Sequence, residues 1–126
     1  MHNGPFLDVE RSCALVCDDF RDCPDVLSSV AELFRDTYPF DINDLRVAHA
    51  ARDCQMVAFL AHKIKGSIVI FHQEGAADAA SELEEKAARG DLQGTEQLVE
   101  LLGDAFLSTC CTVEQAEREL GFAFMN

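Results

Sequence analysis

The sequence predicts an all-α fold, an antiparallel up-down-up-down four-helix bundle with an additional short N-terminal helix. Apolar residues recur at three- and four-residue spacing along most of the chain, no segment shows sustained period-two alternation, and there are only three Pro and seven Gly. Short connections between long helices favour antiparallel neighbours. With 126 residues, the chain is expected to form a single domain over 1–126, in which 1–7 are a frayed tail.

Two helices are predicted in the N-terminal part of the chain. A short amphipathic helix over about 8–17 is expected to cap one end of the bundle. A longer helix begins at Pro24, where the missing N–H costs nothing, and continues to about Ala51. Pro39 is expected to interrupt or kink this helix, because proline removes a helical donor and crowds the preceding turn.

The central segment is the least acidic part of the chain. The protein has 23 Asp plus Glu against 10 Lys plus Arg and a net charge of −13, yet no acid occurs between Cys54 and Gln73. A helix is predicted here with Asp53 as its N-cap and His72 at its end. Helical periodicity then places one set of residues on the side suited to burial. These are Asp53, Val57, Leu60, Ile64, Ser67, Ile68 and Phe71.

Two further helices are predicted after this segment. The first, over 76–89, is rich in Ala and turns small residues inward, which allows close helix approach; the second runs from Leu92 or Thr95 to about Leu120. The inward residues of the first are Ala76, Ala79, Ala80, Leu83 and Ala87. Those of the second are Leu98, Leu101, Leu102, Ala105, Phe106, Thr109, Val113, Ala116 and Leu120.

The other side of the central helix carries a histidine, His62, on a surface of small and apolar residues. Separations of three, four and seven residues bring Gln55, Ala58, Lys65, Gly66 and Val69 onto the same face. Phe59 and Ile70 flank it and fit either the edge of the core or a docking surface. Gly66 is costly inside a helix, by about 0.5–1 kcal/mol relative to Ala. It removes bulk one turn after His62, where a partner protein would approach.

The segment from Ala61 to Ser67, AHKIKGS, resembles the phosphorylated-histidine motif of histidine-containing phosphotransfer (HPt) domains, A-H-x-L-K-G-[SA]. The resemblance extends upstream over 33–53 and downstream over 83–91, so that it covers about 25–120. There is one departure from the family pattern. Related domains usually carry a Gly about ten residues after the histidine, where this chain has His72, and Gly75 follows three positions later.

The resemblance implies that His62 accepts a phosphoryl group from a receiver-domain aspartate and passes it to another response regulator. Lys65 would give electrostatic support, and Gln55, Ala58, Phe59, Gly66 and Val69 would form the docking surface. The implied partners are response-regulator receiver domains and a hybrid sensor histidine kinase. No cofactor is expected on this chain, because Mg²⁺ would come from the receiver. The alternative is a helical adaptor that docks the same partners without being phosphorylated.

The remaining histidines and the six cysteines are expected to be structural or incidental. A metal site formed by His49, His72 and Cys54 is conceivable, but it has no recognised spacing. His2 lies in the predicted tail. The cysteines contain no C-x-x-C pair and are expected to be reduced thiols that serve as small core residues, so no metal site is predicted.

Charge and hydropathy exclude several classes of partner. The strongly acidic composition argues against binding nucleic acid or anionic membranes. The longest strongly apolar run, 68–71, is far shorter than the roughly 20 residues that span a bilayer. Residues 1–5 lack the features of a secretory signal. The expectation is a cytoplasmic protein, taken to be a monomer.

Overall fold

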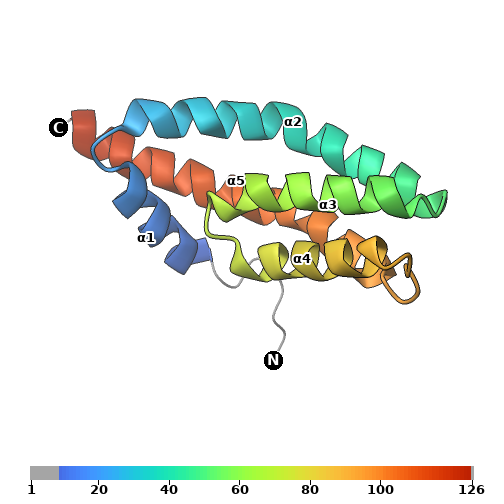
Figure 1. Cartoon of the computed structure of the whole chain (residues 1–126). Helices are drawn as coiled ribbons and strands as arrows, with labels where there is room; N and C mark the ends of the chain where they lie inside the picture. The colour runs from blue at the N-terminus through green and yellow to red at the C-terminus, as the bar shows by residue number, and fades with distance from the viewer. Residues whose placement is uncertain (1–8, 126) are drawn as a thin grey trace.

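The computed structural model of the chain describes residues 9–125, so the predicted frayed tail over 1–7 lies outside the described residues. Every regular element within this range is a helix, which confirms the predicted all-α class. In chain order these are α1 (Val9–Phe20), α2 (Pro24–Ala50), α3 (Cys54–Val69), α4 (Glu74–Ala88) and α5 (Glu96–Met125) (Figure 1).

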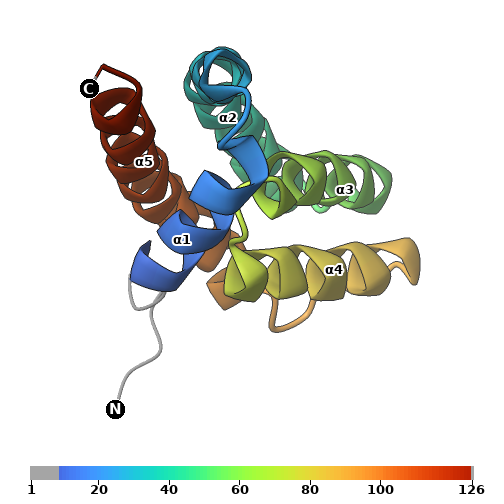
Figure 2. The same cartoon turned by 90° about the vertical axis from the view of Figure 1, so that its left-hand side faces the viewer.

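The four helices α2 to α5 alternate in direction, as predicted for an up-down-up-down bundle (Figure 1). The most extensive contact is between α3 and α4. With 27 and 30 residues, α2 and α5 are much longer than α3 and α4, which have 16 and 15. The short helix α1 packs chiefly against α5 and lies at the end of the bundle (Figure 2), so it covers the part of α5 that α3 and α4 do not reach.

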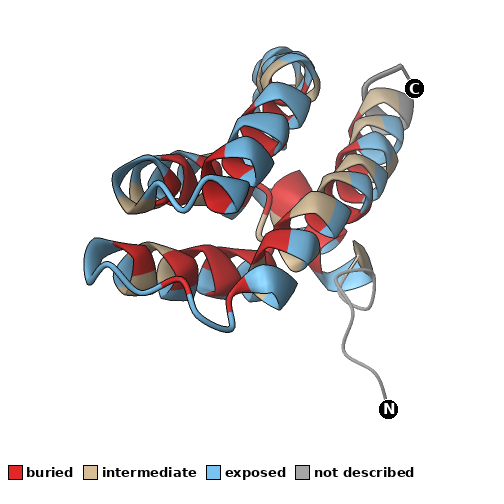
Figure 3. Cartoon of the chain, turned by 90° about the vertical axis from the view of Figure 1, so that its right-hand side faces the viewer, coloured by how far each residue is buried: buried red, intermediate tan, exposed pale blue. Residues whose placement is uncertain are grey.

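The core is one cluster to which all five helices contribute, and the buried residues lie on their inward faces (Figure 3). Aromatic rings fill part of it: the ring centroid of Phe34 lies 4.8 Å from that of Tyr38, 5.4 Å from that of Phe71 and 5.7 Å from that of Phe106. The buried Tyr38 hydroxyl donates a hydrogen bond to the Leu102 carbonyl at 2.7 Å. None of the described helices is long and apolar enough to cross a membrane.

The predicted inward faces of α4 and α5 are confirmed. All five predicted residues of α4 are buried, and those of α5 are buried or partly buried within the core cluster. Pro39 was expected to interrupt or kink the second helix, and it does not interrupt it: α2 continues through this residue to Ala50, and its ribbon bends partway along (Figure 1). One predicted boundary is wrong. The central helix does not reach His72, because α3 ends at Val69.

The early end of α3 has a local cause in the backbone of His72. This residue has a φ of 58°, in the left-handed region that glycine adopts without strain. It therefore occupies the conformation that the family pattern assigns to a Gly. Two contacts to α1 hold it there: its Nε2 lies 2.6 Å from an Asp19 carboxylate oxygen, and its carbonyl accepts a hydrogen bond from the Ser12 hydroxyl at 2.8 Å. The prediction that the central helix extends to His72 was therefore wrong.

Candidate functional site

An N-cap sets where α3 begins, and one buried face sets which side of the helix points into the core. Asp53 is the N-cap, as predicted, and its carboxylate accepts a hydrogen bond from the Met56 amide at 3.2 Å. The predicted inward residues are buried, except that Asp53 is exposed and Ser67 is half-buried. The buried members are Val57, Leu60, Ile64, Ile68 and Phe71. This packing turns the opposite face of α3, with His62, toward solvent.

The His62 side chain is 76% exposed and is held on one ring nitrogen by Glu84 of α4. Its Nδ1 lies 3.2 Å from one Glu84 carboxylate oxygen and 3.3 Å from the other. An ionised carboxylate only accepts hydrogen bonds, so Nδ1 must carry the proton in this contact. In the neutral imidazole the lone pair then lies on Nε2, which has no hydrogen-bond partner within the described part of the chain. The arrangement leaves a nucleophilic nitrogen at the protein surface.

Glu84 was not among the predicted site residues. The sequence around His62 contains no acid between Cys54 and Gln73, but this does not mean that none lies near it in space. In space the carboxylate of α4 lies beside the imidazole. A signal for it was available, because the partner of a residue in an antiparallel helix pair lies about as far beyond the turn as that residue lies before it. His62 and Glu84 are equally distant from Gln73, in the turn between α3 and α4.

The two lysines next to His62 differ in their pairing. Lys63 Nζ lies 3.0 Å from a carboxylate oxygen of Asp41, a buried residue of α2, so this cation is committed to holding α3 against α2. Lys65 is half-buried and has no ion-pair partner within residues 9–121. It follows His62 by three residues, which places both on adjoining parts of the same helical face. Lys65 is therefore the cation that remains available to an incoming anion.

The residues predicted to dock a partner are accessible. Gln55, Phe59, Gly66 and Val69 are exposed and Ala58 is half-buried, with Phe59 at 63% and Val69 at 53% exposure. Ile70, predicted either to edge the core or to dock, is also exposed. We refer to Gln55, Ala58, Phe59, Gly66 and Val69, together with His62 and Lys65, as the His62 face.

Nothing in the described part of the chain requires a glycine at position 66. A Cβ built on it meets nothing within 4 Å, and its φ is not positive. The residue therefore gives up helix stability, by about 0.5–1 kcal/mol relative to Ala, without a gain in internal packing. The lack of a side chain at Gly66 keeps the His62 face open one turn after His62.

The other described histidines have structural contacts, as predicted. His49 is buried, and its Nε2 lies 2.7 Å from the Thr95 hydroxyl oxygen. That hydroxyl donates to the Leu92 carbonyl at 2.6 Å, so it accepts from His49. His49 lies before α3 and His72 after it, and the structure does not bring them together with Cys54 as possible metal ligands. All six cysteines are free thiols, and His2 lies outside the described residues.

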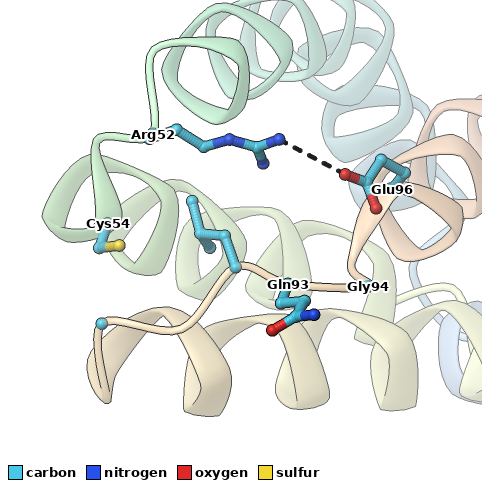
Figure 4. Close-up of a pocket in the computed structure, with 7 residues that line it drawn as sticks. Arg52, Cys54, Gln93, Gly94 and Glu96 are labelled. Atoms are coloured by element: carbon cyan, nitrogen blue, oxygen red, sulfur yellow. Dashed lines mark ion pairs between the residues drawn. The ribbon is translucent and has the colours of Figure 1, made fainter.

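A hollow of about 460 Å³ lies away from His62, beside the turn that precedes α3 and the connection between α4 and α5 (Figure 4). Arg52, Cys54, Gln93, Gly94 and Glu96 line it, and Arg52 pairs with Glu96 across it at 3.6 Å. Because Arg52 and Glu96 pair with each other, neither offers an unpaired charge to a ligand in this hollow. His62 and Lys65 are not among its lining residues, so this hollow is separate from the His62 face.

Comparison with known proteins gives one family. No curated protein and no solved structure matches the chain. The family model of the Hpt domain matches residues 29–117, a range that contains the whole His62 face and Glu84. Hpt domains carry out histidine phosphotransfer in two-component systems and interact there with receiver domains and kinases. The matched range covers most of the chain, from α2 well into α5, and the helical bundle agrees with it. The chain therefore belongs to the Hpt domain family.

Proposed function

We propose that this protein is a phosphorelay intermediate in which His62 accepts a phosphoryl group from the aspartate of a receiver domain and passes it to another response regulator. The observation that carries the proposal is the state of the imidazole. It is 76% exposed on α3, Glu84 engages its Nδ1, and Nε2 is left with the lone pair. Membership of the Hpt domain family supports the same reaction.

In the first transfer, the Nε2 lone pair of His62 attacks the phosphorus of the receiver's aspartyl phosphate. A P–N bond forms while the P–O bond to the aspartate breaks, so the receiver regains its carboxylate and His62 holds a phosphoramidate. Positive charge develops on the imidazole during the attack. The Glu84 carboxylate, 3.2 Å from Nδ1, is placed to stabilise this charge. The second transfer reverses these steps toward the aspartate of another receiver.

The incoming phosphoryl group also brings negative charge close to Glu84, and two features offset the resulting repulsion. Lys65 supplies a free cation one turn along α3. We propose that the receiver would supply the Mg²⁺ that offsets charge on the phosphoryl oxygens, because among the described residues no group of three His, Cys, Asp or Glu ligands lies at His62. This chain then contributes the nucleophile, its orientation and the docking surface.

We propose that a receiver docks on the exposed apolar part of the His62 face. Phe59 and Val69 lie on either side of His62 along α3 and offer exposed apolar area. Gly66 lies between His62 and Val69 and leaves room for close approach. A monomer located in the cytoplasm, serving receivers and a hybrid sensor histidine kinase, fits this role. The six free thiols are consistent with a reducing compartment.

The proposal is tested by phosphotransfer from purified, phosphorylated receiver domains of the host organism. We expect at least one receiver to lose its label to this protein, and the acquired label to be lost in acid and kept in alkali, as a phosphoramidate requires. A panel of receivers that bind the protein but never transfer the label would refute the proposal in favour of the helical adaptor.

A further inference from the structure

Two buried thiols and one carboxylate converge at the junction of α1 and α5. Cys13 and Cys17 are four residues apart on one face of α1 and are only 2% and 4% exposed. Glu119 of α5 faces both: one of its oxygens lies 3.7 Å from the Cys13 sulfur and the other 3.7 Å from the Cys17 sulfur. A ligand atom from each residue lies within 4.8 Å of the other two.

These three groups are of the kinds that hold a borderline-soft divalent cation. Thiolate sulfur and carboxylate oxygen both bind Zn²⁺, at about 2.3 Å and 2.0–2.2 Å. In a tetrahedral site those bond lengths separate a sulfur from an oxygen by about 3.6 Å. Each thiol already has this separation from one Glu119 oxygen, but the two contacts are to different oxygens of the carboxylate. A small rotation of the carboxylate would present one oxygen to both sulfurs, and the three ligand atoms already lie within 4.8 Å of one another.

Without a cation, both thiols carry their protons and the Glu119 carboxylate accepts their hydrogen bonds. Burial, followed by the neighbouring Cys17 and Glu119, raises the pKa of Cys13 to about 12. The pKa of Cys17 is raised too, chiefly by burial. Both thiols are therefore neutral at pH 7, and each donates toward the Glu119 carboxylate. Gln115, one turn before Glu119, donates a hydrogen bond to this carboxylate at 3.3 Å and helps to orient it.

We infer that Cys13, Cys17 and Glu119 form a binding site for a divalent cation of the Zn²⁺ class that fastens α1 to α5. On binding, two S–H bonds break and their protons pass to solvent, two metal–sulfur bonds and one metal–oxygen bond form, and a water completes the tetrahedron. One negative charge on the carboxylate becomes one negative charge on the metal complex, so the net charge of the site does not change. The site is independent of His62, which lies on α3.

This inference differs from the expectation drawn from cysteine spacing. Cys13-x3-Cys17 contains no C-x-x-C pair, and spacing alone predicted no metal site. The third ligand follows Cys17 by 102 residues, and only the packing of α1 on α5 brings it close. The consequence would be structural, because a cation bound to both helices stabilises the docked position of α1 by mass action.

The test is a titration of the protein with Co²⁺ or Cd²⁺, followed by the charge-transfer absorption of the metal–thiolate complexes. The buffer contains a reductant that is not itself a thiol. The full chain carries Ser at the four other cysteines, Cys23, Cys54, Cys110 and Cys111, so that only Cys13 and Cys17 can give the signal. We expect saturation at one equivalent and a Zn²⁺-dependent rise in melting temperature. In the otherwise native chain, one equivalent of Cd²⁺ should protect Cys13 and Cys17 from alkylation, as peptide mass spectrometry would show.

Two exposed acids of α5 provide a matched pair of variants. Glu119→Gln should weaken Cd²⁺ binding by about tenfold or more, while Glu114→Gln, outside the cluster, should leave it unchanged. Neither change should alter the circular dichroism spectrum. Absence of charge-transfer absorption, together with alkylation of both thiols in the presence of Cd²⁺, would overturn the inference. Equal Cd²⁺ affinity in the Glu119→Gln and Glu114→Gln variants would also overturn it.

Discussion

Replacing Gly66 separates the stability of α3 from its ability to receive a partner. A Cβ at this position meets nothing within 4 Å and the backbone φ is not positive, so a side chain fits without strain. Gly66→Ala should therefore stabilise the fold by about 0.5–1 kcal/mol, the difference in helix propensity. Gly66→Gln should also be at least as stable as the native protein, since Gln is a better helix former than Gly.

The same two variants should differ in phosphotransfer. The Ala methyl adds little bulk, whereas the Gln side chain would project where a receiver approaches His62. We expect Gly66→Gln to lower the rate of transfer from a phosphorylated receiver by about tenfold or more, equivalent to 1.4 kcal/mol or more. Denaturant unfolding measures stability, and transfer of label at sub-saturating receiver concentrations measures docking.

Gly121→Gln is the control for a bulky residue in place of a helical glycine. Gly121 lies within α5, and a Cβ built there also meets nothing within 4 Å. This variant should gain similar stability and keep the native transfer rate. The reasoning is refuted if Gly66→Gln is folded and transfers at the native rate, or if Gly121→Gln loses transfer to the same extent.

Three other predictions follow from the contacts of the site and the core. Lys65→Ala should slow transfer or shorten the lifetime of the phosphohistidine by at most about fivefold, because a single surface cation contributes 1 kcal/mol or less; native values of both would remove Lys65 from the site. Glu84→Ala should slow transfer by about two- to tenfold relative to Glu84→Gln, because the Gln side chain keeps a hydrogen-bond acceptor for Nδ1 of His62. Equal transfer rates in the two variants would contradict the orienting role of Glu84. Burial raises the pKa of Tyr38 above its usual 10.0 and that of Cys13 to about 12, so the folded state keeps protons that the unfolded chain releases. The free energy of unfolding should thus fall as pH rises from about 9 toward 12. The Tyr38→Phe variant should show a smaller fall above pH 10. A free energy of unfolding that does not change with pH in this range would contradict both pKa assignments.

Periodicity predicted which faces of the helices are buried because each helix has one apolar stripe and the fold offers one core. His62, Lys65 and Gly66 could be placed on the outer face of α3 for this reason alone. The prediction needed no knowledge of which helices are neighbours. It therefore survived errors in where individual helices begin and end.

Contacts between helices could not be read from periodicity, and the most informative side chains of the site depend on them. Glu84 beside His62 and Asp41 beside Lys63 come from the two helices that flank α3. Each pair is nearly symmetric about the turn that joins its helices, so an explicit pairing of the antiparallel helices would have suggested both contacts. Glu119, which is not joined to α1 by a turn, gives no such signal.

The end of α3 was mispredicted because a non-glycine residue adopts a left-handed conformation there. Local preference disfavours His72 at a φ of 58°, and apolar residues continue up to Phe71, so the pattern extends the helix too far. Tertiary contacts outweigh this preference, since Asp19 and Ser12 of α1 both bind His72. Contacts of this kind depend on how α1 packs and have no signature in the local sequence.

The central claim is that His62 is the phosphorylated residue, and single His→Gln variants test it most directly. His62, His49 and His72 would each be replaced and treated with the same phosphorylated receiver, with circular dichroism confirming the fold. We expect His62→Gln to abolish acid-labile labelling and the other two to retain it, because His49 is buried against Thr95 and His72 is bound to Asp19. Labelling that persists in His62→Gln and disappears in His49→Gln or His72→Gln would contradict the account.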